Sequence, residues 1–250
     1  MDDKGEILPP WHGDRQRAAL RGFARLKAVL WRRSLWLYQG WKLWREAWYR
    51  PLVRGLGRAS ASLDLFASAR VQAQSDVFGE TPILTTRHLL AVAERYLPNC
   101  PSTFVDLGCG RGATCLTAAC LGWQALGFEK ETAWVEAARR VASSLEEAGL
   151  ASEARFEAGD FLPAEWPDEA LFLVVATAYP EEMRAEIALR LAGLGQGAAV
   201  LTADWELPAE QFVLRWSGTL PVEWGLARFA LWSLQPRPEG APPKAEAGGR

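Results

Sequence analysis

A glycine-rich turn near the middle of the chain is the first candidate for a ligand site. The apolar run 103–107 carries Asp106 next to its end and suits a buried strand, and residues 113–121 have the composition of a packed helix. Three glycines lie between them: Gly108, Gly110 and Gly112. Glycines between a strand and a helix allow a tight turn and let a ligand lie against the bare main chain at the helix N-terminus.

Two further acidic residues end the next two apolar runs, where such a site needs them. Glu129 lies 19 residues beyond Gly110 and can accept hydrogen bonds from both hydroxyls of a ribose. Asp160 ends the third run and can accept a hydrogen bond from the amino group of adenine. Asp106 would attract a cationic amino group. This set predicts a site for S-adenosylmethionine, whose methionine end carries such a group.

A dinucleotide site is the rival interpretation. Counted with Ala113, the glycines also satisfy the loose pattern G-x-G-x-x-G/A. A pyrophosphate is doubly anionic and would be repelled by Asp106. That repulsion, the third glycine and the pair Gly159–Asp160 favour S-adenosylmethionine, with a dinucleotide and a ligand-free turn as the alternatives.

Composition limits the class of protein. The chain has 250 residues, of which 49% are hydrophobic, so it can hold one sizeable domain and an appendage. Its cysteines form neither a CxxC pair nor a metal-binding spacing: Cys100, Cys109, Cys115 and Cys120. From this spacing we expect free thiols and no structural metal. We also expect a cytoplasmic protein, because the acidic N-terminus is followed by no apolar stretch typical of a signal peptide.

The formal net charge of −2 hides an asymmetry. Between Arg15 and Arg58 there are twelve lysines and arginines and a single acid, Glu46, so this stretch carries about +11 and the remainder about −13. Its leucines and tryptophans recur at helical spacing, which predicts one or two helices. The longest uncharged run, residues 34–41, is far shorter than the roughly 18 to 20 residues that a membrane span needs.

Three roles fit this basic, aromatic stretch. It could pack on the rest of the chain as a helical cap, dock on an anionic membrane at its inner face, or bind nucleic acid through stacked aromatic rings. The first two can coexist, and no known nucleic-acid module is present, so nucleic acid is the least favoured partner.

The chain divides into three parts by pattern: an N-terminal helical segment at 1–58, a main domain at 59–235 and a polar, disordered tail at 236–250. Helix breakers mark a turn at the first boundary: Pro51, Gly55 and Gly57. After them, residues 60–73 have helical composition again.

Within the main domain, apolar runs of strand length alternate with helix-like stretches. The runs are residues 103–107, 124–129, 154–158, 171–176 and 198–203. The helix-like stretches are residues 83–96, 113–121, 134–148 and 181–194. Alternation predicts a parallel sheet with helices on both faces. Residues 211–216 and 227–234 lack an intervening helix, which predicts an antiparallel hairpin. The expected fold is α/β: a Rossmann-like, doubly wound, seven-strand sheet with a C-terminal hairpin and an N-terminal helical segment.

This pattern resembles the class I, seven-strand methyltransferases, and within them the non-SET histone-lysine methyltransferases of the disruptor-of-telomeric-silencing type and related protein-lysine enzymes. The match runs from about Val77 to Pro208 and rests on four segments and one tryptophan: residues 77–81 (VFGET), 104–110 (FVDLGCG), 127–130 (GFEK), 159–162 (GDFL) and Trp166. The resemblance implies S-adenosylmethionine-dependent transfer of a methyl group to a protein lysine.

The resemblance also assigns roles to residues of the loop that precedes the predicted helix 83–96. Phe78, Glu80 and Thr81 would cover the methionine end of the cofactor, with Glu80 near its amino group. An ordinary helix start is the alternative, since Thr81 is followed by a proline. Phe161 and Ala176 complete the expected cofactor-binding set.

The sequence departs from this family after the fourth strand. Where the histone enzymes have an Asn-Asn-Phe type of sequence, this chain has Ala-Thr-Ala-Tyr-Pro at residues 176–180. This position lines the entrance for the methyl acceptor, so Tyr179 and Thr177 are the candidate catalytic residues. His88 falls in a predicted helix and is expected to be structural. The alternatives are a methyltransferase of a membrane-associated small molecule and a cofactor-binding pseudoenzyme that acts through its N-terminal segment.

Overall fold

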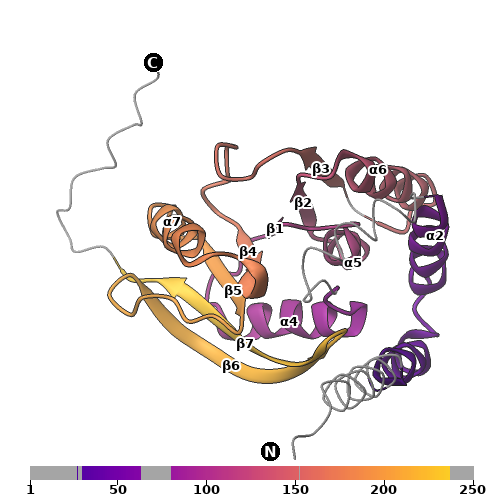
Figure 1. The fold of residues 1–250 in the computed structure, drawn as a ribbon, viewed down its shortest axis with the longest axis horizontal. Coiled ribbons are helices and arrows are strands. Elements are labelled where there is room, and N and C mark those ends of the chain that lie inside the picture. Colours follow the sequence, from indigo (N-terminus) through magenta and orange to yellow (C-terminus); the bar gives the residue numbers. More distant parts are fainter. Residues whose placement is uncertain (1–26, 28–29, 63–79, 152, 237–250) are drawn as a thin grey trace, which may run out of the picture.

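The computed structural model describes residues 27, 30–62, 80–151 and 153–236 of the chain. A single seven-strand sheet forms its centre, with the order β3-β2-β1-β4-β5-β7-β6 (Figure 1). The strands are β1 (Thr103–Leu107), β2 (Gln124–Glu129), β3 (Ala154–Ala158), β4 (Leu171–Val174), β5 (Ala199–Ala203), β6 (Phe212–Val222) and β7 (Gly225–Leu234). Strands β1 to β5 are parallel, and β7 and β6 continue the sheet antiparallel. The α/β fold with a C-terminal hairpin is therefore confirmed.

The strand order reverses between β1 and β4. Along the chain β2 and β3 extend the sheet on one side of β1, and β4 and β5 extend it on the other. In open α/β sheets, ligands bind in the crevice beyond the carboxyl ends of the strands at such a reversal. The glycine-rich turn follows β1 and therefore lies at this point.

Helices cover both faces of the sheet. They are α4 (Ile83–Tyr96), α5 (Ala113–Cys120), α6 (Thr132–Glu147) and α7 (Glu181–Ala192), with a short 3-10 turn η1 (Ala176–Ala178) after β4. The apolar sides of α4, α5 and α6 share one core with one face of the sheet, whereas α7 packs in a second core on the opposite face. Strand β4 is buried throughout, as its unbroken apolar sequence predicts for an inner parallel strand.

Helix α2 (Tyr49–Ser62) replaces the turn that its breakers predicted. Pro51 lies in the first turn of the helix, where its missing N–H has no intrahelical acceptor to lose. Gly55 lies against α6: a Cβ atom here would come within 2.8 Å of Cγ1 of Val141. The glycine therefore serves close helix packing, and α2 runs across the predicted boundary at residues 58 and 59.

Strand β6 is longer than predicted, since it continues from Phe212 to Val222. Between Leu214 and Trp216 its register against β7 shifts, so the strand carries a bulge. Pro221 is tolerated because β6 is the edge strand and has only one neighbour. Strand β4, in contrast, ends at Val174, and the predicted last residue Ala176 begins η1.

A helical segment at residues 30–43 precedes α2 and packs on α4 and the hairpin. Its buried side carries Leu35, Gln39 and Leu43. The side-chain oxygen of Gln39 accepts the N–H of Leu84 at 3.0 Å, which satisfies one free donor in the first turn of α4. The Nε1–H of Trp31 donates to the carbonyl oxygen of Val222 at 2.7 Å.

The predicted helix at 60–73 beyond Ser62, the loop residue Phe78 and the tail at 237–250 lie outside the described residues. Within the described part of the chain, no helix combines the length and the apolar character needed to cross a bilayer.

Candidate cofactor site

The glycine-rich turn folds back over the end of β2. The N–H groups of Gly108 and Cys109 both donate to the carbonyl oxygen of Phe128, at 3.0 and 2.9 Å. Gly108 has φ +90°, a left-handed conformation that strongly favours glycine. The turn thus brings main chain from β1 and β2 together at the strand-order reversal.

Glu129 is buried at the end of β2 and holds this turn in place. Its Oε2 accepts the N–H of Gly110 and its Oε1 accepts the N–H of Glu131, both at 3.0 Å. Each carboxylate oxygen can accept more than one hydrogen bond. Capacity for two ribose hydroxyls therefore remains, and that role for Glu129 stays a prediction.

Asp106 lies beneath the turn with 5% of its surface exposed. Its carboxyl Oδ2 accepts the hydroxyl hydrogen of Thr114, from the first turn of α5. Burial raises the pKa of Asp106 to about 7, with the Thr114 hydrogen bond opposing the rise and the charge of Glu129 adding to it. A buried carboxyl in this state is ready to ionise when a cationic group arrives beside it.

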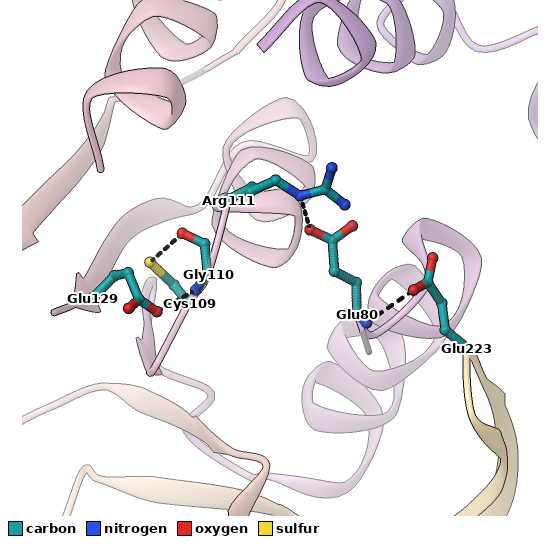
Figure 2. A network of polar contacts seen from close by, with 6 residues as sticks. All are labelled: Glu80, Cys109, Gly110, Arg111, Glu129 and Glu223. Carbon is teal, nitrogen blue, oxygen red and sulfur yellow. Dashed lines mark hydrogen bonds and ion pairs between the residues drawn. The ribbon is translucent and has the colours of Figure 1, made fainter. Parts of the chain in front are cut away.

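A second cluster of charged side chains borders the turn on its other side (Figure 2). The Nε of Arg111 and Oε1 of Glu80 form an ion pair at 2.7 Å. The N–H of Glu80 donates to Oε2 of Glu223 at 3.2 Å. Burial and then the charge of Glu80 raise the pKa of Glu223. Residues from three distant segments thus meet at the glycine turn.

A small cavity of about 60 Å³ lies between the turn and these acids. Its lining comprises Glu80, Thr81, Asp106, Gly108, Cys109, Gly110, Ala113, Thr114 and Val175. Sites that enclose drug-sized ligands have volumes of roughly 300–1,000 Å³. Because Glu129 and Asp160 are absent from this lining, the cavity corresponds to only part of the expected site, the part near Asp106 and Glu80.

Tyr179 lies against the glycine turn, although it is not part of the cavity lining. Its hydroxyl donates to the carbonyl oxygen of Leu107 at 2.9 Å, and a Cβ atom on Gly108 would overlap that hydroxyl. The Tyr179 ring also lies 5.9 Å from the ring of Phe161. Burial, aided by the charges of Asp106 and Glu129, raises the pKa of Tyr179, so it stays protonated and is no general base near neutral pH.

The remaining predicted residues differ in their accessibility. Asp160 is exposed after β3, and its Oδ1 accepts the N–H of Leu162 at 2.9 Å. Phe161 and Ala176 are buried in the core beside α7. Thr177 is half-buried in η1 and is absent from the cavity lining. Thr81 is buried and lines the cavity, whereas Phe78 lies outside the described residues.

Three site residues escaped the sequence interpretation: Thr114, Arg111 and Glu223. Thr114 lies eight residues beyond Asp106, and a helix starting at Gly112 could have suggested their contact. Arg111 lies between two glycines of the turn, and nothing in its residue type alone indicates an ion pair. Glu223 is 143 residues from Glu80 and reaches it only because the hairpin turn lies there.

No group of three or more His, Cys, Asp or Glu side chains within the described residues could hold a metal ion. The four cysteines are free, and Cys109 and Cys115 are buried. His88 is exposed on α4, and its ring lies 6.1 Å from that of Trp216 on β6.

Comparison with known proteins gives likeness in structure alone. No protein-family model and no curated protein matches the chain. Among solved structures, a magnesium protoporphyrin IX methyltransferase (ChlM) from Synechocystis PCC 6803 with bound SAM is 21% identical over 60% of this chain and 78% of its own, with a TM-score of 0.47. An RNA methyltransferase from Salinibacter ruber in complex with S-adenosyl-L-homocysteine is 22% identical over 67% and 99%, with a TM-score of 0.44.

A methyltransferase from Geobacter sulfurreducens is 18% identical over 70% of this chain and 89% of its own, with a TM-score of 0.45. Identities below 25% and TM-scores below 0.5 leave the activity to be argued from the site of this chain. The first of these proteins is named for magnesium protoporphyrin IX and the second for RNA, and none of the three is named for a lysine acceptor.

Proposed function

We propose that this chain is an S-adenosylmethionine-dependent methyltransferase. The observation that carries the proposal is the pair of buried carboxyl groups, Asp106 and Glu129, on either side of a glycine turn at the strand-order reversal. Such a reversal is where α/β sheets bind ligands, and the carboxyl groups select which ligand it takes.

The chemistry of these groups fits the cofactor. Its methionine end carries a cationic amino group, for which Asp106 and Glu80 supply negative charge. Glu129 would hold the ribose hydroxyls, and exposed Asp160 the adenine amino group. A dinucleotide fits poorly, because its pyrophosphate would face Asp106 and Glu80 with Arg111 already paired.

When bound, the cofactor supplies a methyl group activated by a sulfonium. The protein must then align the acceptor and exclude water. Tyr179 covers Gly108 and contacts the main chain of Leu107, so a ligand that lies against Gly108 would displace it. Once displaced, its ring would line the acceptor entrance together with Thr177.

For the acceptor we propose an amine, with a protein lysine as the first choice. The family resemblance supports this choice, and the carboxyl group of Glu223, beside Glu80, would attract a cationic side chain. A lysine has a reference pKa of about 10.4 and must lose a proton before it accepts the methyl group. An apolar entrance formed by Tyr179 would favour that loss.

A membrane-associated small molecule is the second candidate acceptor. The observation that favours it is the set of large apolar side chains exposed on helix 30–43, Trp41 and Leu37 among them. A protein that binds the cofactor without turnover is the remaining alternative.

Calorimetry with S-adenosylhomocysteine tests the cofactor assignment. We expect the wild-type chain to bind and the affinity of Glu129→Ala to be lower by roughly a hundredfold or more. Glu136→Ala changes an exposed glutamate on α6 and should leave the affinity unchanged. Tighter binding of NADH than of S-adenosylhomocysteine would overturn the proposal.

Transfer of labelled methyl to an extract lacking this gene product tests the acceptor. Label recovered as methyl-lysine from a protein band supports the lysine proposal, and label extracted into organic solvent supports a small lipid-soluble acceptor. Cofactor binding with no label in either fraction supports the pseudoenzyme.

A further inference from the structure

One side of helix 30–43 is apolar and faces solvent. At 100° per residue, positions 30, 37 and 41 lie opposite the buried positions 35, 39 and 43. The exposed fractions of their side chains are 56% for Leu30, 76% for Leu37 and 66% for Trp41. Trp44 directly follows the helix and is 51% exposed. Large apolar side chains gathered on one exposed surface indicate a binding surface.

The helix is held to the body of the protein by polar contacts on its other side. Trp31 bonds to the hairpin turn, Gln39 bonds to the start of α4, and Glu46 forms an ion pair with Arg87 at 2.7 Å. This docking fixes which side of the helix faces outward. The solvent-facing side is therefore a constant feature of the fold.

Positive charge surrounds the apolar side. Three basic side chains lie exposed near it, those of Arg33, Lys42 and Arg45, and the single acid of residues 27–62, Glu46, is already paired. The ammonium nitrogen of Lys42 lies 4.6 Å from the ring centroid of Trp41, and the guanidinium of Arg45 lies 5.1 Å from that of Trp44. Tryptophan next to lysine or arginine is typical of the headgroup region of a membrane, where ring and charge each find a favourable environment.

A groove lies along a different side of the same helix. A cavity of about 520 Å³ lies between helix 30–43, α4 and β6. Its lining is mostly apolar and includes Lys42 and His88, together with Arg87, whose guanidinium is paired with Glu46. The groove and the exposed helix side together favour an amphiphilic, anionic partner.

We propose that helix 30–43 docks the protein on an anionic lipid bilayer. In this arrangement Leu30, Leu37, Trp41 and Trp44 enter the headgroup boundary, and Arg33, Lys42 and Arg45 contact lipid phosphates. This proposal goes beyond methyl transfer and stands without it, because docking requires no cofactor.

The test is co-sedimentation of the full chain with lipid vesicles. The probes are vesicles of phosphatidylcholine alone and of phosphatidylcholine with about 30% phosphatidylglycerol. We expect binding to the anionic vesicles, weak binding to the neutral ones, and a decrease as salt is raised. The full chain keeps residues 1–26 present to contribute or compete.

Paired variants locate the surface. Leu37→Ser/Trp41→Ser should reduce binding to anionic vesicles at least tenfold, and Lys42→Gln/Arg45→Gln should also weaken it. The matched apolar control is Leu189→Ser/Leu226→Ser, since these side chains are 69% and 64% exposed on α7 and β7. The matched charge control is Arg95→Gln/Arg140→Gln, on the exposed surfaces of α4 and α6. Circular dichroism establishes that each variant is folded.

Three results would overturn the proposal. The first is no sedimentation of the wild-type chain with anionic vesicles. The second is an equal loss in the control pair on α7 and β7. The third is a dimer in light scattering that Leu37→Ser/Trp41→Ser dissociates while vesicle binding is absent, because a second copy of the chain would then cover this surface.

Discussion

The hydroxyl of Tyr179 donates a hydrogen bond to the carbonyl oxygen of Leu107, and the phenol lies over Gly108 as a result. Leu107 ends the central strand β1, and Tyr179 follows β4, the strand beside it. The contact therefore bridges the crevice at the strand-order reversal.

Tyr179→Phe should tighten cofactor binding. The variant removes the hydrogen bond to Leu107, worth about 0.5–1.5 kcal/mol, which opposes opening of the crevice. We expect the Kd for S-adenosylhomocysteine to fall by up to about tenfold, measured by calorimetry. Tyr96→Phe, at the exposed end of α4, should leave the Kd unchanged. A weaker complex with Tyr179→Phe would mean that the hydroxyl binds the ligand directly.

Cofactor binding should strengthen as pH rises toward 7 and should release a proton. The pKa of Asp106 is about 7 without ligand, and a cationic amino group beside it would lower that value. Below pH 7 the Kd should fall by up to about tenfold for each pH unit. Calorimetry in buffers with different heats of ionisation measures the number of protons released on binding. A Kd independent of pH between 5.5 and about 7 would place the amino group elsewhere.

Stability should show the opposite trend. Because the pKa of Asp106 is raised on folding, its contribution is fully present below its unfolded pKa near 3.8 and is lost as pH rises to about 7. A rise from 3.8 to about 7, at about 1.4 kcal/mol for each unit of pKa, corresponds to about 4 kcal/mol. Urea unfolding from pH 4 to 7 should show this loss in the wild-type chain and not in Asp106→Asn, which carries no charge there.

Arg111→Met should weaken cofactor binding with little effect on stability. The ion pair with Glu80 is partly exposed, so its worth to folding is about 1 kcal/mol or less. Loss of the ion pair leaves Glu80 without this anchor at the edge of the site. The Kd for S-adenosylhomocysteine should therefore rise by about five- to tenfold. Arg155→Met breaks an ion pair of the same length, 2.7 Å, on the exposed surface and is the control. Equal changes in Kd in the two variants would show that Arg111 does not contribute to the cofactor site.

Gly55→Ala should destabilise the fold, whereas Gly57→Ala should not. A Cβ atom at position 55 would come within 2.8 Å of Val141, and one at position 57 would meet nothing within 4 Å. We expect a loss of about 1–3 kcal/mol in the first variant and a gain of about 0.5–1 kcal/mol in the second. Denaturant unfolding measures both. In Gly55→Ala/Val141→Ala the penalty of Gly55→Ala should shrink, and a full penalty there would contradict the close contact.

The strands at the site could be predicted because their sequence pattern is local. Residues 103–107, 124–129 and 154–158 are strands with the predicted bounds, since apolar runs between turns leave few alternatives. The acids Asp106 and Glu129 followed from this alignment, because parallel strands bring their carboxyl ends to one edge. In the structure both carboxyl groups are buried near the carboxyl ends of β1 and β2, next to the glycine turn.

Contacts between distant segments could not be predicted in the same way. Glu223 reaches Glu80 through the length and twist of a hairpin whose register includes a bulge after Leu214. The breakers in α2 misled for a related reason, because the packing of Gly55 on Val141 outweighs helix propensity. The identity of the methyl acceptor depends on the position of Tyr179 relative to distant residues such as Leu107, which no local sequence pattern encodes. Acceptor chemistry therefore remains a proposal.

The bond between Trp31 and Val222 has a consequence for synthesis of the chain. The two residues are 191 positions apart, so the hairpin that binds the first described helix is synthesised long after it. At about 5–20 residues per second, helix 30–43 waits roughly 10 to 40 s before the hairpin exists. Throughout that interval α4, whose Leu84 lies 45 residues after Gln39, is available to the buried side of the helix, but the hairpin contact is missing. Nascent chains of this protein should therefore depend on a chaperone, or on an early encounter with a surface, more than a chain whose first helix has a local partner.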